Sequence, residues 1–183
     1  EPVTTAVAHP CEEAALAGAL EAGRRGLIRP ILVGPANRIS ALAARHRIDL
    51  GDVEIVDVPH SHAAAARAVE LVREGRAELL MKGSLHSDEL LAEVLSRETG
   101  LRTSRRLSHV FIMDVPTYHK VLLVTDGGIN INPGLEEKAD ICRNAIDLAV
   151  ALGVERPKVA VLAAVETASS KMPATIDEAG RCK

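Results

Sequence analysis

The chain alternates between short apolar runs rich in Val, Ile and Leu and longer segments that have the periodicity of a helix. Strands are expected at residues 4–9, 29–35, 53–59 and 77–83, and helices at residues 11–26, 36–48, 61–76 and 87–100. Strands that are separated by helices normally pair in parallel and carry the helices on their faces. The alternation therefore predicts an α/β fold with mostly parallel sheets and helices on both faces.

The strand–helix alternation pauses after these four pairs. Two apolar runs, at residues 107–116 and 119–127, are joined by a short link, which is typical of an antiparallel hairpin. After it, the pattern predicts a long helix at 135–152, a buried strand at 157–166 and the start of a helix at 173. The hairpin indicates a change of sheet, and hence two α/β domains, at residues 1–107 and 108–183.

Composition argues against several classes of protein. Aromatic residues make up 1% of the chain, as Phe111 and Tyr118, whereas proteins that bind single-stranded nucleic acid stack its bases on aromatic rings. The net charge of −3 argues against a general binder of nucleic acid or of membrane surfaces. Cys11, Cys142 and Cys182 have no metal-binding or disulfide spacing. With no signal-peptide pattern and no apolar stretch of about 18 residues, the sequence predicts a cytoplasmic protein.

The first candidate site follows the strand expected at 77–83. Lys82, Gly83 and Ser84 place a cation, a flexible backbone and a hydroxyl just before a helix. Ligands of open α/β sheets bind at the carboxyl ends of the strands, and helix N-termini attract anions. The loop is therefore a candidate anion site, and a strand–helix loop with a solvated lysine is the alternative interpretation.

The second candidate site is the segment "TDGGININPG", which ends the second run of the hairpin. Gly127 allows a ligand to approach the backbone closely, and Asp126 ends the strand. A period of two would put Asn130 and Asn132 on one face and the intervening isoleucines on the other. The segment matches neither a dinucleotide-binding nor a phosphate-loop fingerprint, so an ordinary structural loop is the alternative.

Basic residues precede the first run of the hairpin. Arg105 and Arg106 offer donors that suit phosphate, although a basic edge that keeps a sheet soluble is the alternative. On an extended segment the two point opposite ways, and Arg106 shares a face with Ser108. Ser108 and His109 likewise face opposite ways, which argues against a Ser–His nucleophilic pair.

These loops and their flanks resemble the phosphate acetyl/butyryltransferase family, especially its short butyryltransferase-like branch, which includes modules fused to an enoyl-CoA hydratase-like domain. The segments that carry the resemblance are "ELLMKGSLHSDELL", "GLRTSRRLSHVFIMDVP", "LLVTDGGININPGLEEKADICRNAIDLAVALG" and "PKVAVLAAVETASSKMPATIDEA". The resemblance implies exchange of an acyl group between CoA and inorganic phosphate. It also implies a two-domain fold similar to isocitrate dehydrogenase and a homodimer or higher homo-oligomer. CoA acts as a substrate, and neither a bound cofactor nor a metal is expected.

The resemblance implies that the candidate loops line the substrate cleft. The substrate-binding residues expected on this basis are Lys82, Gly83, Ser84, Arg105, Arg106, Ser108, Asp126, Gly127, Asn130 and Asn132. Leu91 stands where acetyltransferases of the family often have an arginine, which favours the butyryltransferase-like branch.

Members of the family continue for roughly another hundred residues, so the fold is expected to be incomplete at its C-terminus, with the catalytic residues in the missing part. A truncated, non-catalytic CoA- or anion-binding module of a fusion protein is the alternative. An oxidoreductase of the isocitrate dehydrogenase type would need metal-binding aspartates and a nucleotide loop, and the sequence shows neither.

Overall fold

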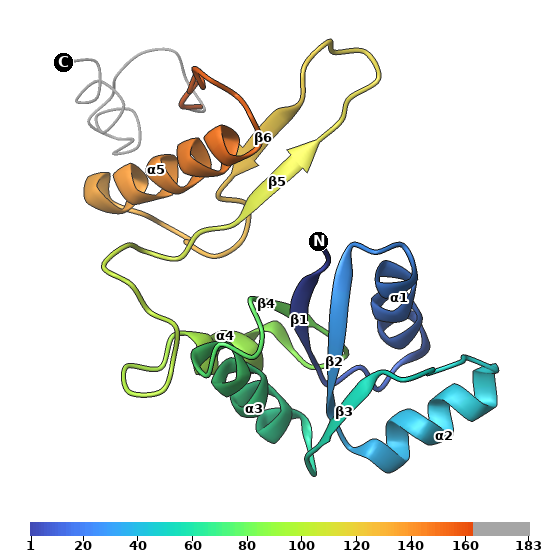
Figure 1. The fold of residues 1–183 in the computed structure, drawn as a ribbon. Coiled ribbons are helices and arrows are strands. Elements are labelled where there is room, and N and C mark those ends of the chain that lie inside the picture. The colour runs from blue at the N-terminus through green and yellow to red at the C-terminus, as the bar shows by residue number, and fades with distance from the viewer. Residues whose placement is uncertain (163–183) are drawn as a thin grey trace. The chain divides into compact units, whose positions relative to one another are not determined.

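The computed structural model describes residues 1–162, and its contacts divide the chain into two compact units, Glu1–Arg102 and Thr103–Lys183 (Figure 1). The division falls at Arg102, whereas the sequence pattern places the boundary after Leu107. No helix within residues 1–162 is long and apolar enough to cross a membrane.

The first unit, all of whose residues are described, is a four-stranded parallel sheet with helices on its faces (Figure 1). All four predicted strands are confirmed, and the sheet order is β3-β2-β1-β4. The strands are β1 (Val3–Ala8), β2 (Ile28–Gly34), β3 (Glu54–Asp57) and β4 (Leu79–Lys82). The helices are α1 (Glu13–Arg24), α2 (Ala36–His46), α3 (Ser61–Arg73) and α4 (Ser87–Val94).

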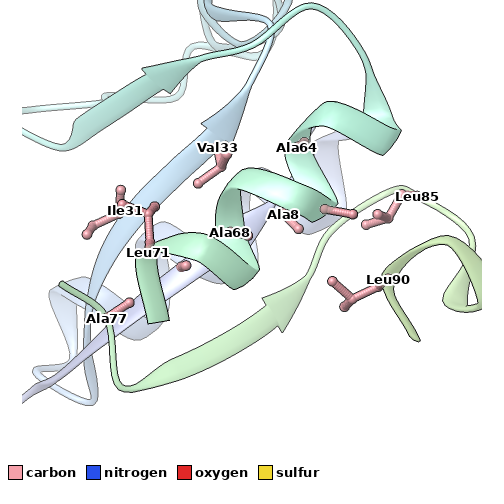
Figure 2. Close-up of a cluster of buried hydrophobic side chains, with 11 residues drawn as sticks. Ala8, Ile31, Val33, Ala64, Ala68, Leu71, Ala77, Leu85 and Leu90 are labelled. Carbon is pink, nitrogen blue, oxygen red and sulfur yellow. The ribbon is translucent and has the colours of Figure 1, made fainter. Parts of the chain in front are cut away.

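Two apolar clusters, one on each face of this sheet, form the core of the first unit. Side chains of a strand alternate between the two faces, so Ala8 belongs to one cluster and Val7 to the other. Figure 2 shows the first cluster, in which Ala64 and Ala68 of α3 face the sheet. Because these side chains are small, α3 packs close to the sheet without any aromatic residue. The second cluster joins Leu16 of α1 and residues of α2 to the opposite face.

The order of the strands creates a topological switch point beside β1. The chain leaves β1 toward β2 on one side, and after β3 it returns to place β4 on the other side. In the register of the sheet, Ala8 pairs with Val33 of β2 and with Lys82 of β4. The residues that follow Ala8 and Lys82 therefore meet at the carboxyl edge, where open α/β sheets bind their ligands.

The described part of the second unit contains a hairpin and a helix. The strands β5 (Val110–Met113) and β6 (Leu122–Thr125) pair antiparallel, which confirms the predicted hairpin. The predicted long helix is also confirmed, as α5 (Leu135–Ala151). Residues 157–162 form no strand, so that part of the prediction is wrong, and the rest of the predicted strand and the following helix lie outside the described residues.

Candidate functional site

The loop after β4 is bonded to the loop after β1 at the carboxyl edge of the first unit. The Oγ atom of Ser84 donates to the carbonyl oxygen of His9 at 2.8 Å and accepts from the backbone N–H of Cys11 at 3.0 Å. The backbone N–H groups of Gly83 and Ser84 donate to the carbonyl oxygens of Ala8 and His9, each at 2.9 Å. A Cβ atom on Gly83 would lie 2.5 Å from the Ala8 oxygen, so no larger residue fits there without a shift of backbone.

The ammonium group of Lys82 lies at the same edge of the sheet. Its Nζ atom donates to the carbonyl oxygens of Leu85 at 3.0 Å and Gly83 at 3.3 Å. Within residues 1–162 no carboxylate forms an ion pair with Lys82. An ammonium has three donors, so one donor and the whole positive charge are available to an anion.

His9 is a residue of this edge that the sequence motifs did not indicate. It is only 7% exposed, its backbone has φ = 54°, and its Nε2 atom is buried with no hydrogen-bond partner among residues 1–162. Burial lowers the pKa of the imidazole and Arg38 lowers it further, against the opposing effects of Glu89 and Glu12. The imidazole is therefore neutral near pH 7. Its position between a strand and Pro10 is the signal that sequence reading could have used.

In the second unit, Asp126 organises the loop that follows β6. Its carboxylate accepts from the backbone N–H groups of His109 at 3.0 Å, Ile129 at 3.3 Å and Asn130 at 2.9 Å, and also from the Asn130 side chain. Burial raises the pKa of Asp126, but these hydrogen bonds outweigh it and hold the pKa below the ordinary value. With both oxygens bonded to protein groups, Asp126 shapes the loop.

Arg106 and Asn130 are in direct contact. The Nε atom of Arg106 donates to Oδ1 of Asn130 at 2.5 Å, and the Asn130 amide donates to the carbonyl oxygen of Leu107 at 3.0 Å. The guanidinium of Arg106 also pairs with Glu137 at 2.6 Å, and its backbone N–H donates to Asp140 at 3.2 Å. The structure thus brings together two of the predicted binding residues, with an acid already paired to the cation.

Arg105 and Ser108 are held by other residues of α5. Arg105 forms an ion pair with Asp147, which raises the pKa of the guanidinium. The Asn144 amide donates to Ser108 Oγ at 2.9 Å and to the carbonyl oxygen of Arg106 at 2.8 Å. The strand β5 begins only at Val110, so the prediction that Arg106 and Ser108 share a strand face is wrong: side-chain hydrogen bonds to α5 fix this segment instead.

The predicted alternation of asparagines and isoleucines is also wrong. Ile131 is fully exposed while Ile129 is half-buried, and Asn132 is exposed while Asn130 is half-buried. Residues 129–132 form no strand, because the hydrogen bonds to the Asp126 carboxylate fold the backbone back on itself. Asn132 is therefore more exposed to solvent than Asn130.

The ten predicted substrate-binding residues are thus divided between the two units. Within the first unit Gly83 and Ser84 bond the carbonyl oxygens of Ala8 and His9, and Lys82 donates to the carbonyl oxygen of Gly83. Within the second, Arg106 and Asp126 both contact Asn130, and a Cβ atom on Gly127 would lie 3.9 Å from His109 Nδ1. No group of three or more His, Cys, Asp or Glu side chains in residues 1–162 could hold a metal ion.

Comparisons of sequence relate this chain to a family of transferases. A family model described as "Phosphate acetyl/butaryl transferase" matches residues 60–179. A phosphate acetyltransferase of Rhizobium meliloti is 62% identical over 182 residues, which cover 100% of this chain and 58% of that protein. A phosphate butyryltransferase of Clostridium acetobutylicum is 40% identical over 174 residues, which cover 95% of this chain and 58% of that protein. The chain therefore spans somewhat more than half the length of these curated relatives.

Solved structures show the same fold. A branched-chain phosphotransacylase of Enterococcus faecalis superposes with a TM-score of 0.78 at 28% identity, covering 97% of this chain and 62% of that one. A phosphotransacetylase of Streptococcus pyogenes has a TM-score of 0.76 at 18% identity, covering 98% of this chain and 65% of that one, and it supports the fold alone. The sequence and fold matches agree, and the chain belongs to the phosphate acetyl/butyryl transferase family.

Proposed function

We propose that the protein containing this chain exchanges an acyl group between CoA and inorganic phosphate, converting acyl-CoA and phosphate into acyl phosphate and CoA. The observation that carries the proposal is the 62% identity, along the whole chain, to a phosphate acetyltransferase. The butyryltransferase relative extends the proposal to short acyl groups longer than acetyl. The isocitrate dehydrogenase-like, two-domain architecture is part of this proposal.

The polar groups at the carboxyl edge of the first unit suit the chemistry of this exchange. Phosphate and the CoA phosphates are anions, and Lys82 offers them a charge that no described carboxylate neutralises. The acyl carbonyl must be polarised by fixed donors as its oxygen gains negative charge, and the thiol must lose its proton to attack. The substrates themselves carry the reacting groups, so neither a metal nor a bound cofactor forms part of the proposal.

The proposal also includes substrate-binding residues of the second unit. Arg106 and Asn130 form a hydrogen-bonded pair, and the Asn144 amide donates to both Ser108 Oγ and the carbonyl oxygen of Arg106. Asp126 and Gly127 support that group by shaping the loop. A cytoplasmic location and a homodimeric or higher homo-oligomeric state complete the proposal.

A thiol-release assay tests the proposal directly. Acetyl-CoA, propionyl-CoA and butyryl-CoA are each incubated with inorganic phosphate and the protein, and free CoA is measured with a thiol reagent. Phosphate-dependent release of CoA from at least one of them is expected, and the ratio of the three rates gives the acyl preference. CoA binding with no release from any of the three would contradict the enzyme and indicate a non-catalytic binding module.

A further inference from the structure

A groove lies at the amino edge of the first sheet, opposite the carboxyl edge that carries Lys82. At this end of the sheet β1 begins (marked N in Figure 1), and the groove has a volume of about 810 Å³. Pockets that bind small molecules usually have volumes of about 300–1,000 Å³, so the groove is large enough for such a ligand. None of the substrate-binding residues inferred from the sequence lines it.

The groove forms because β2 begins before its neighbour β3 does. The first register pair of these two strands is Ile31 with Glu54, so residues 28–30 of β2 have no partner on the β3 side. Pro30 has no backbone N–H group, so it leaves no donor unpaired at this open edge. Residues 52–53, which lead into β3, also line the groove. The space between the two strands is therefore a fixed consequence of their register.

The aliphatic part of the lining belongs to the core of the first unit. Leu20 of α1 and Ile31 of β2 are only 6% and 5% exposed, and they belong to the clusters on the two faces of the sheet. A Cβ atom on Gly23 would lie 3.2 Å from Cδ of Pro30, so the end of α1 packs tightly against β2. The groove can therefore bury an apolar group of a ligand against a surface that is already packed.

Two charged residues of the lining, Arg29 and Asp52, have no partner. Each lies two residues before the first register pair of β2 and β3, so they occupy matching positions on the two sides of the groove. Among residues 1–162 neither side chain forms an ion pair or a hydrogen bond, so they do not pair with each other. The other charged residues of the lining are already paired: Arg76 with Glu54 at 2.6 Å, and Arg24 with a glutamate of its own helix.

We propose that this groove is a second ligand site, which binds an aliphatic α-amino acid between Arg29 and Asp52. The carboxylate of the ligand pairs with the guanidinium of Arg29, and its ammonium pairs with the carboxylate of Asp52. Its side chain lies against the aliphatic part of the lining. A phosphate dianion suits the groove less well, because Asp52 and Glu54 repel it. The amino acid is not a reactant of the acyl exchange, so this inference does not depend on the proposed function.

NMR of the ¹⁵N-labelled protein tests the proposal with L-leucine as the probe. Leucine is expected to move the backbone N–H resonances of Thr4, Ile31 and Val53, which line the groove, and to leave that of Lys82 in place. Two analogues of leucine each lack one charge: isoamylamine has no carboxylate, and isocaproate has no ammonium. Each is expected to bind about tenfold more weakly than leucine, because it loses one hydrogen bond between charged groups.

Substitutions of the two unpaired residues assign each charge of the ligand to its partner. Arg29→Met is expected to weaken leucine binding about tenfold and to bind isoamylamine as tightly as leucine, and Asp52→Asn is expected to do the same with isocaproate. Arg29→Asp combined with Asp52→Arg exchanges the two charges and is expected to bind leucine more tightly than Arg29→Asp alone. Arg45→Met, at an exposed and unpaired arginine of α2 outside the groove, should leave the affinity unchanged. Circular dichroism checks that each variant is folded.

Two results would overturn the site. One is that leucine, added up to its solubility, moves none of the resonances of the groove. The other is that isoamylamine and isocaproate bind the unsubstituted protein as tightly as leucine does, because binding would then depend on the aliphatic group alone. Neither result bears on the acyl exchange, which the release of CoA tests separately.

Discussion

Replacing Gly83 by Ala should destabilise the first unit strongly, because a side chain at this position meets backbone. The added Cβ atom would lie 2.5 Å from the carbonyl oxygen of Ala8 and 2.6 Å from that of His9. Neither oxygen belongs to a flexible side chain, so the loop after β4 must move away from β1. That movement weakens the hydrogen bonds from the N–H groups of Gly83 and Ser84 to the same two oxygens.

The size of the effect follows from these two contributions. Overpacking costs about 1–3 kcal/mol, and each of the two weakened hydrogen bonds contributes about 0.5–1.5 kcal/mol. The free energy of unfolding should therefore fall by about 3 kcal/mol. Urea denaturation followed by circular dichroism measures it, and hydrogen exchange at the amides of Gly83 and Ser84 localises it to the edge of the sheet.

A matched control is available in α1. Gly18 lies in that helix with no atom within 4 Å of an added Cβ, so Gly18→Ala should raise stability by about 0.5–1 kcal/mol through helix propensity alone. If the Gly83 variant unfolds at the same urea concentration as the unsubstituted chain, the result contradicts the close approach of Gly83 to the Ala8 and His9 carbonyl oxygens.

Four further substitutions test individual contacts of the two units. Ser84→Ala should lower the free energy of unfolding by about 0.5–1.5 kcal/mol in urea denaturation, because the hydroxyl's hydrogen bonds are lost while Cys11 N–H and the His9 carbonyl oxygen keep their backbone partners. The hydrogen bonds to Asp126 lower its folded-state pKa, so they stabilise the fold above the pKa of the unfolded chain, and this contribution is lost as the pH falls through the folded pKa. Acid titration of Asp126→Asn should therefore lack that step. Lys82→Met should weaken phosphate binding, measured by calorimetry, about tenfold, whereas Arg105→Ala should leave it unchanged because Asp147 already pairs with Arg105.

The strands and helices of the first unit could be predicted because their signals are local. Apolar runs such as residues 29–35 and 77–83 are bounded by Gly and Pro, and the helical segments between them have a clear period. The hairpin and α5 followed from the same kind of evidence. Each of these elements is determined mainly by residues that are close together in the sequence.

The misassigned features depend on contacts between distant residues. The two asparagines of the loop were expected on one face, but the carboxylate of Asp126 bends the backbone between them. Arg106 was expected on a strand, but Asn144, 38 residues later in the chain, bonds its carbonyl oxygen instead. His9 lies 75 residues from Ser84, whose hydroxyl donates to its carbonyl oxygen, so the sequence around His9 shows its place between a strand and Pro10 but not this contact.

The groups already bonded to Lys82 and to Arg106 decide which of these two cations can hold a phosphate more strongly. A phosphate that binds Arg106 must share the guanidinium with Glu137, whose carboxylate lies 2.6 Å from Nη1 and repels the incoming anion. At Lys82 the existing partners are neutral carbonyl oxygens at 3.0 and 3.3 Å, which leave the positive charge uncompensated by any carboxylate of residues 1–162. Residue type alone favours arginine for phosphate, since its fork of donors matches the anion. The contacts reverse that preference here, so Lys82→Met should weaken phosphate binding more than Arg106→Met does; the opposite order would show that phosphate displaces Glu137 and binds the guanidinium.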